Sequence, residues 1–252
     1  MALALATGTV ARAQDDPPRD NDKPALALMG TIPIYWGEAA GLAELIGGAA
    51  APHWAREQLE ARYRLVPLDY LTPEALASQS RLLLAQPRGL TPEENVALDA
   101  WVRAGGHLLL FADPLMTGES RFGIGDRRRP QDVALLSPIL GHWGLQLEFD
   151  EAQEPGIAMR EIAGTEVPVS HAGRFAMEPA GGHDCQLSGE AVLARCHLES
   201  GEIVILADAA LLDHAGPWTG SAAGLEMLTR MAFGDSGENA GMEPAEEEIV
   251  AR

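Results

Sequence analysis

Residues 82–114 contain two short apolar runs separated by one helical segment, and this arrangement constrains the fold more than any other stretch of the chain. The first run, 82–85, ends at Gln86, and the second, 108–112, ends at Asp113. Strands that are apolar throughout and are joined by a helix form parallel pairs with both faces buried. The pattern therefore predicts an α/β sheet, and in such sheets ligands bind beyond the carboxyl ends of the strands.

The segment between the two runs carries the signals of a helix start and a helix end. Thr91 is suited to the N-cap, Pro92 to the first helical position and Glu94 to the reciprocal bond of a capping box. Gly105 and Gly106 are typical of a helix end. We therefore expect a helix that begins after Thr91 and ends before Gly105.

Similar apolar runs elsewhere extend this pattern to a whole domain. We expect a mainly parallel sheet flanked by helices on both faces, with strands at 25–29, 82–86, 108–112 and 203–207. Pro67 lacks a backbone N–H, so the short run 65–68 is expected at an edge of the sheet. Further helices are expected at about 52–64, after Thr72, after Ser137 and at 221–233.

The chain divides into a leader, a domain and a tail. Residues 1–24 resemble a secretory signal and linker, because a short apolar run precedes Ala11-Arg12-Ala13, an A-x-A cleavage pattern. A disordered alanine-rich leader is the alternative. Residues 25–233 are expected to form a single α/β domain with a small β-rich insertion at about 150–200, and residues 234–252 an acidic disordered tail. We expect a periplasmic or exported protein without a membrane span, since no apolar run approaches ~20 residues.

The net charge of −19 argues against nucleic acid as a partner, because a strongly acidic protein repels phosphate backbones. Arg127-Arg128-Arg129 is unexpected in so acidic a chain. The triplet is either a solvated loop paired with local carboxylates or a patch that docks an acidic or phosphate-rich partner.

The two cysteines, Cys185 and Cys196, flank a predicted hairpin that turns at Ser188-Gly189. Three states fit the sequence: a disulfide, two free buried thiols, or a metal site completed by His183 and His197. A disulfide would fit an oxidising compartment.

Three segments together resemble the auxiliary domain of ABC-type transport systems typified by the GldG proteins of gliding motility. They are LTPEENVALDAWVRAGGHLLLFADP, SPILGHWGLQLEF and GEIVILADAALLDH. The resemblance spans roughly residues 25–233 and implies a sheet similar to that of class I glutamine amidotransferases. It also implies ATPase and permease subunits of an ABC transporter as partners.

The residues that follow the predicted strands are the candidates for a ligand site. We expect one crevice at the carboxyl edge of the sheet, with aromatic groups for stacking, arginines for an anion and polar groups for hydroxyls. Its predicted members are Tyr35, Trp36, Gln86, Arg88, Asp113, Arg121 and Asp208. The expected ligand is carbohydrate-like or anionic. The alternative is that Pro33 and Pro87 turn their loops away, leaving Trp36 as a plug and Arg88 in solvent.

The sequence offers no motif for catalysis. The strand-to-helix turn after Ala85 holds no cysteine or serine, so an amidotransferase-type hydrolase lacks its nucleophile. Ser170 and His171 are adjacent, and neighbours on a strand point to opposite faces, so we expect no catalytic pair there. His214 could act as a general base, although a surface histidine is the commoner case.

A divalent cation held by Glu38, Asp113 and Asp208 is a further alternative, although strand-tip aspartates more often cap turns. We expect neither enzymatic activity nor a cofactor. The sequence therefore favours a binding module, with a structural interaction subunit that keeps a vestigial pocket as the alternative.

Overall fold

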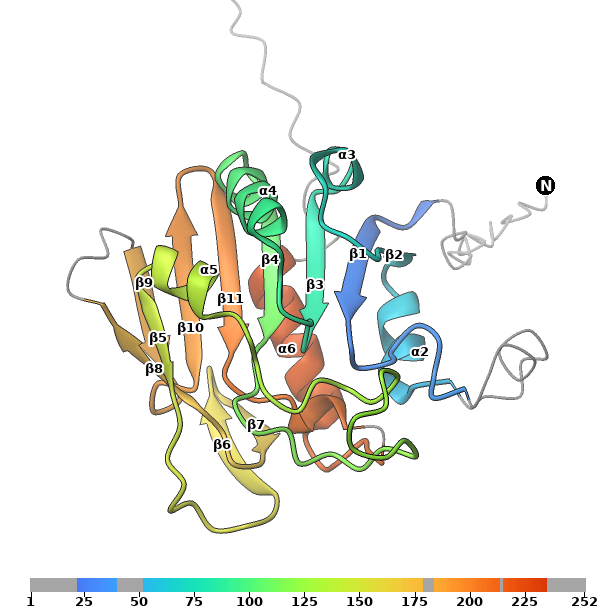
Figure 1. Ribbon diagram of the computed structural model, residues 1–252, viewed down its shortest axis with the longest axis vertical. Coiled ribbons are helices and arrows are strands. Elements are labelled where there is room, and N and C mark those ends of the chain that lie inside the picture. The colour runs from blue at the N-terminus through green and yellow to red at the C-terminus, as the bar shows by residue number, and fades with distance from the viewer. Residues whose placement is uncertain (1–21, 40–51, 179–183, 214, 235–252) are drawn as a thin grey trace, which may run out of the picture.

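The computed structural model describes residues 22–39, 52–178, 184–213 and 215–234. The predictions for most of the leader, for the acidic tail beyond Gly234, and for His183 and His214 lie outside these residues. The core is a seven-stranded sheet with strand order β2-β1-β3-β4-β11-β10-β9 (Figure 1). Its strands are β1 (Ala25–Gly30), β2 (Arg64–Pro67), β3 (Arg81–Ala85), β4 (His107–Phe111), β9 (Asp184–Ser188), β10 (Leu193–Leu198) and β11 (Gly201–Leu206).

The first five strands in this order run parallel to one another. β1 pairs with β2 and β3, and β4 lies between β3 and β11. The expectation of a mainly parallel α/β sheet built on these four apolar runs is therefore confirmed. β2, which ends at Pro67, lies at the edge of the sheet, where a residue without an N–H is tolerated.

The sheet is mixed, because two antiparallel strands extend it beyond β11. β10 leads into β11 through a tight turn at Glu199, which has a φ of 54°, and β9 pairs with β10. Part of the expected β-rich insertion at about 150–200, the strands β9 and β10, belongs to the main sheet. The remaining strands form two small antiparallel pairs, β5 (Leu145–Glu148) with β8 (Arg174–Met177) and β6 (Ala158–Ile162) with β7 (Thr165–Val169).

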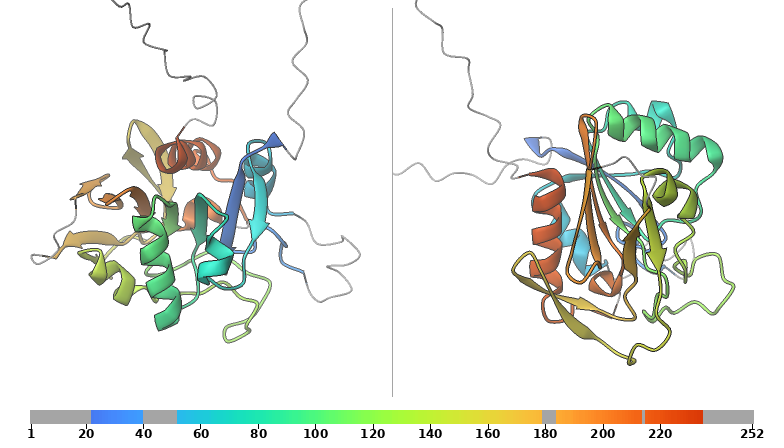
Figure 2. Two further views of the ribbon diagram at one scale, coloured as in Figure 1. Left: turned by 90° about the horizontal axis from the view of Figure 1, so that it is seen from above. Right: turned by 90° about the vertical axis from the view of Figure 1, so that its left-hand side faces the viewer.

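Helices cover both faces of the sheet (Figure 2). The helical elements are α2 (Trp54–Glu60), α3 (Pro73–Leu76), α4 (Pro92–Arg103), α5 (Ser137–His142), the 3₁₀ turn η2 (Ala210–Leu212) and α6 (Ser221–Phe233). On one face, Leu83 and Phe111 share a buried cluster with Leu225 of α6. On the other, Leu84 and Leu110 share a second cluster with Leu98 of α4. Alternate side chains of each strand thus pack into two separate hydrophobic cores, one on each face of the sheet, as the continuous apolar runs predict.

The two cysteines lie directly opposite each other in the antiparallel pair β9 and β10, and their sulfur atoms are 2.01 Å apart. The disulfide among the three states left open by the sequence is therefore the one observed. Cys196 is buried in the core, while Cys185 is half-buried at the edge strand.

Removing this disulfide is expected to destabilise the protein. The bond closes a short loop, with a sequence separation of 11, and such a crosslink stabilises the folded state by about 2 kcal/mol by restricting the unfolded chain. The double variant Cys185→Ser/Cys196→Ser should therefore have a lower urea midpoint than the oxidised protein, and the reduced wild type should behave like the variant. Equal midpoints for all three forms would show that the bond contributes nothing.

Candidate functional site

The carboxyl ends of β1, β3, β4 and β11 meet at one edge of the sheet, at the bottom of Figure 1. The seven residues predicted for a ligand site follow these strands, but they do not line one crevice. They fall into three groups: Gln86, Asp113 and Asp208 are buried within the edge, Arg88 belongs to the start of α4, and Tyr35, Trp36 and Arg121 belong to two loops that project from the edge.

Gln86 is fully buried and joins the ends of β3 and β4. Its backbone has a φ of 48°, a left-handed conformation that turns the side chain back toward the sheet. The amide Nε2 donates to the carbonyl oxygens of Asp113 at 3.0 Å and Gln131 at 2.9 Å, and Oε1 accepts from the Asp113 N–H at 2.8 Å. Every polar atom of this amide is thus engaged inside the protein, so Gln86 positions the neighbouring loops and has no free group for a ligand.

Asp113 and Asp208 are buried strand-tip carboxylates that organise the turns behind them. Asp113 accepts from the N–H groups of Leu115 and Ala209, and Asp208 accepts from Ala210 and Ser170, all at 2.8–3.0 Å. These contacts, like those of Gln86, remove both carboxylates from the predicted ligand site.

Burial dominates the electrostatics of these carboxyl groups. Loss of water raises the pKa of Asp113 to about 7, although the two N–H donors oppose the shift, and the carboxylate of Asp213 adds to it. Burial also raises the pKa of Asp208 well above its ordinary value, and Asp113 adds to that effect. Carboxyl groups buried together away from water cannot all be ionised at neutral pH without a cost in free energy.

The cation site proposed for Glu38, Asp113 and Asp208 has no support in the observed geometry. Glu38 accepts from the N–H of Arg121 at 2.9 Å, on a different loop from the turns that the two aspartates serve. Across the described ranges, no group of three or more histidine, cysteine, aspartate or glutamate side chains could hold a metal ion.

Arg88 is a structural residue at the start of α4. Its guanidinium forms two hydrogen bonds of 2.8 Å with the buried carboxylate of Glu94, and it lies over the ring of Tyr70. Glu94 also completes the expected capping box with Thr91. Arg88 is therefore engaged by the capping-box glutamate, which lies six residues further along the chain.

Glu94 should make the protein sensitive to acid. Hydrogen bonds from Arg88, Thr91 and Leu71 lower the pKa of Glu94 to about 2. A carboxyl group whose pKa falls on folding stabilises the folded state above its unfolded value, and this contribution is lost as the pH falls toward 2. Glu94→Gln should lower the free energy of unfolding at pH 7 by about 2 kcal/mol in urea titrations and flatten its fall between pH 4.5 and pH 2. An unchanged acid profile would contradict this account.

Two loops at the carboxyl edge line an open pocket of about 500 Å³. One loop follows β1 and contributes Thr31 and Trp36; the other follows β4 and contributes Phe122 and three consecutive arginines. The described lining consists of Gly30, Thr31, Pro33, Trp36, Gly37, Ala39, Phe122, Arg127, Arg128 and Arg129.

The two loops are bound to each other and to the sheet. The Thr31 hydroxyl donates to the carbonyl of Gln86 and accepts from the N–H of Gln131 at 2.8 Å. Further out, Arg121 donates from its backbone N–H to the Glu38 carboxylate and from its guanidinium to the Glu38 carbonyl, both at 2.9 Å. Arg121 therefore holds the pocket walls together and does not line the pocket. Buried Gln86 anchors the same wall through Gln131.

The arginine triplet follows the first of the two alternatives, pairing with local carboxylates, at two of its three positions, and docking of an acidic partner stays a prediction. Arg128 pairs with Asp126 at 2.7 Å and Arg129 with Asp132 at 3.0 Å, as expected of a solvated loop. Within the described part of the chain, by contrast, no ion pair or hydrogen bond engages the Arg127 side chain. Sequence reasoning noted the triplet as unusual but did not place it at the site; its three positive charges in an acidic chain were the available signal.

Ser170 and His171 lie closer than strand alternation predicts. β7 ends at Val169, so neither residue is in the strand, and His171 has a φ of 52°. The Ser170 hydroxyl lies 3.5 Å from His171 Nδ1 and accepts from Thr117 at 2.8 Å. The expectation that the two side chains point apart is therefore wrong. Ser170 is nevertheless buried, and its backbone N–H binds Asp208.

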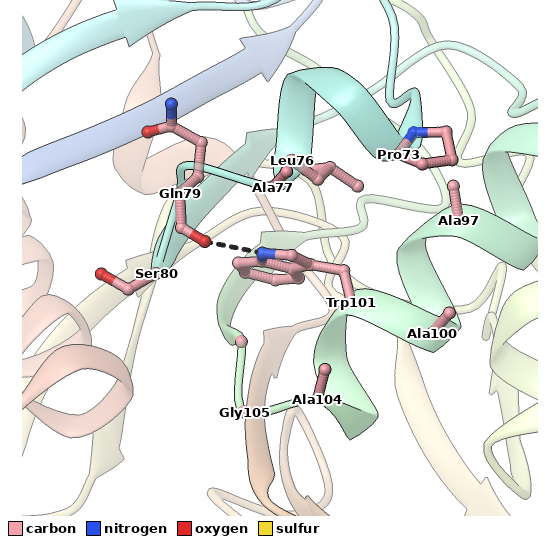
Figure 3. A pocket seen from close by; sticks show the side chains of 11 residues that line it. Pro73, Leu76, Ala77, Gln79, Ser80, Ala97, Ala100, Trp101, Ala104 and Gly105 are labelled. Atoms are coloured by element: carbon pink, nitrogen blue, oxygen red, sulfur yellow. Dashed lines mark hydrogen bonds between the residues drawn. The ribbon is translucent and has the colours of Figure 1, made fainter.

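A second pocket, of about 430 Å³, lies at the opposite edge of the sheet, between α3 and α4 (Figure 3). Trp101 of α4 lines it and donates to the carbonyl of Gln79 at 2.8 Å. No charged side chain is among its described lining residues. The two pockets therefore differ in chemistry: the one at the amino edge is apolar, and the one at the carboxyl edge is cationic.

Comparisons with known proteins leave the family open: no family model matches the chain, and no curated protein matches it. Among solved structures, the mmIFT52 N-terminal domain aligns over 87% of this chain and all of its own, with a TM-score of 0.49 and 12% identity. An exo-β-1,4-mannosidase from the Opitutaceae bacterium strain TAV5 and a β-galactosidase from Rahnella sp. R3 each align over 83% of this chain, with TM-scores of 0.45 and identities of 11% and 9%. The chain spans about a third of the length of the two glycosidases, at 34% and 31%.

Proposed function

We propose that this protein is a non-enzymatic binding module, the auxiliary domain of an ABC-type transport system acting in the periplasm, and that its carboxyl-edge pocket takes an anionic ligand. The observation that carries the proposal is the local reversal of charge. The chain has a net charge of −19, yet the described lining of this pocket includes three arginines and no acidic side chain. The rest of this acidic protein repels anions, whereas the arginines of the pocket attract them. An anion would therefore bind at this pocket in preference to other parts of the surface.

The transport assignment rests on the resemblance of the sequence to GldG-like auxiliary domains. The parallel order of β1, β3, β4 and β11 is compatible with the amidotransferase-like sheet that this resemblance implies. The disulfide supports a periplasmic location, because such bonds persist in oxidising compartments. None of the helices that the structure describes is long and apolar enough to span a membrane.

A thermal-shift screen tests the binding function. Phosphate, sulfate, glucuronate, glucose 6-phosphate and 2-naphthoate form the panel, and at least one is expected to raise the melting temperature by a few degrees at saturation. Arg127→Ala should abolish the shift. Arg174→Ala removes the same charge from an exposed position on β8 and should retain it. If no anion of the panel raises the melting temperature of the wild type or of Arg174→Ala, the pocket does not bind anions.

The second candidate is a structural interaction subunit with a vestigial pocket. The side chains of Gln86, Asp113 and Asp208 favour this alternative, because their hydrogen bonds go to backbone groups of the protein itself and hold the neighbouring loops. Under this alternative, Arg127→Ala would weaken only the association with a transporter subunit. A hydrolase of amidotransferase-like fold is the least favoured alternative, since the turn after Ala85 carries Gln86 and Pro87 in place of a nucleophile.

A further inference from the structure

We infer that the ligand of the carboxyl-edge pocket is a planar aromatic ring carrying an anionic group, and not a sugar. This inference rests on the proposed function, which requires only that the pocket bind an anion. The pocket volume of about 500 Å³ suits one or two fused rings, since small-molecule sites of 300–1,000 Å³ are usual.

Trp36 supplies an exposed and oriented aromatic surface. Its side chain is 56% exposed although it lines the pocket, which is unusual for so large an apolar group. Its ring meets the ring of Tyr35 edge-on, with centroids 4.7 Å apart and an angle of 75°. Arg56 in turn holds Tyr35, with its guanidinium 4.6 Å from the ring centroid and a 2.7 Å bond to the Tyr35 carbonyl. The indole is therefore supported in one orientation and keeps much of its surface free for stacking.

Phe122 provides a second aromatic group in the lining and fixes the arginine loop. The ring is buried, and the Arg128 guanidinium lies 4.2 Å from its centroid. Arg129 donates to the Phe122 carbonyl at 3.1 Å. These contacts hold Arg128 and Arg129 against the loop itself, where Asp126 and Asp132 offset much of their charge and their hydrogen-bonding groups are largely occupied.

Arg127 is the group best placed to bind the anion directly. It lines the pocket together with two arginines that are paired with aspartates, whereas its own side chain makes no ion pair within the described residues. A guanidinium can bind a carboxylate, sulfate or phosphate through two parallel hydrogen bonds. The pocket therefore offers one strong anion-binding group beside an aromatic surface.

The described lining residues are poorly suited to a sugar. A polyol needs several donors and acceptors at fixed positions, and carboxylates or amides usually provide the acceptors. No aspartate, glutamate, asparagine or glutamine is among the described lining residues. The only hydroxyl there belongs to Thr31, which already donates to Gln86 and accepts from Gln131. A ligand that presents apolar faces and a single charged group matches these side chains.

Isothermal titration of the full chain at low ionic strength tests this inference with four matched probes. 2-Naphthoate carries both the ring and the charge, 2-naphthalenemethanol only the ring, cyclohexanecarboxylate only the charge, and glucose 6-phosphate the charge on a sugar. We expect 2-naphthoate to bind at least about tenfold more tightly than each of the other three, because only it uses both groups.

Two substitutions separate the contributions of ring and charge. Trp36→Ala should weaken 2-naphthoate binding about tenfold and leave cyclohexanecarboxylate unchanged, whereas Trp36→Phe should retain most of the affinity. Arg127→Ala should weaken both carboxylates and leave the neutral alcohol unchanged. Arg174→Ala is the matched control and should change nothing. Both pocket residues are exposed, so folding of the variants, checked by circular dichroism, is expected to be intact.

The outcomes distinguish this inference from the proposed function. If glucose 6-phosphate binds as tightly as 2-naphthoate and Trp36→Ala has no effect, the aromatic ligand class is wrong and anion binding stands. If no probe binds and the thermal-shift panel is also silent, both proposals are wrong. If 2-naphthoate binds but Arg127→Ala and Trp36→Ala leave its affinity unchanged, its site lies elsewhere and the inference fails.

Discussion

Replacing Gln86 with leucine is expected to lower the free energy of unfolding by about 3 kcal/mol, the largest effect we expect from a single substitution in this protein. Leucine preserves most of the volume but removes the hydrogen bonds to Asp113 and Gln131. The Asp113 N–H and the Gln131 carbonyl then lose their partners in a region where Gln86 itself has no exposed surface. Each buried polar group left unpaired costs about 1–3 kcal/mol.

Urea denaturation of Gln86→Leu measures this effect, and Gln146→Leu is the matched control. Gln146 is exposed on β5, so its replacement is expected to change stability by less than about 0.5 kcal/mol. Gln86→Leu should also weaken ligand binding, because Gln86 holds, through the Gln131 carbonyl, the loop that carries the pocket arginines. A loss of stability no greater than that of the control would show that this buried amide does not hold the sheet edge together.

The free energy of unfolding is expected to fall by at least about 2–3 kcal/mol between pH 5 and pH 8 as the buried carboxyl group of Asp113 loses its proton. Burial raises the pKa of Asp113 to about 7 in the folded protein, against an ordinary value of 3.8. In this pH range the folded state holds a proton that the unfolded chain has released, so stability declines as the pH rises and levels off above the folded pKa. Each unit of pKa difference corresponds to about 1.4 kcal/mol. Asp208, whose pKa is also raised by burial, acts in the same direction.

Chemical denaturation at several pH values, with Asp113→Asn as the comparison, measures this dependence. Asparagine does not titrate, so the slope between pH 5 and pH 8 should fall by at least half. The variant is also expected to be less stable at pH 5, because its amide group cannot accept both the Leu115 and Ala209 N–H bonds. Equal stability of the wild type at pH 5 and pH 8 would show that Asp113 is ionised throughout.

The framework of the sheet was predictable because its signals are local. Continuous apolar runs identified β1, β3, β4 and β11, Thr91 and Glu94 identified the start of α4, and Pro67 identified an edge strand. The antiparallel extension was not foreseen. β9 and β10 show alternating burial, which fits a strand in any small sheet, and their partner is decided by the tight turn at Glu199.

The site was harder to predict because competition between polar groups is not local. Order along the chain correctly brought Gln86, Asp113 and Trp36 to the carboxyl edge, but it could not show which groups would bind one another. The Gln86 side chain is hydrogen-bonded to Asp113 and Gln131 inside the protein, and Arg88 forms an ion pair with Glu94. The pocket arginine that makes no ion pair with the described residues is Arg127, which lies far along the loop after β4. No strand of the described chain ends near it, so the order of strands along the chain could not predict its place in the pocket.

The position of the ligand site is tested most directly by the indole N–H signals of the five tryptophans in a ¹H–¹⁵N spectrum. Trp36 lies in the carboxyl-edge pocket, Trp101 in the apolar pocket at the opposite edge, and Trp143 is buried between α5 and β5. On titration with 2-naphthoate, the Trp36 signal is expected to move and those of Trp101 and Trp143 to stay in place, and Arg127→Ala should suppress the movement. Movement of the Trp101 signal instead, or of none of the five, would contradict the proposed site.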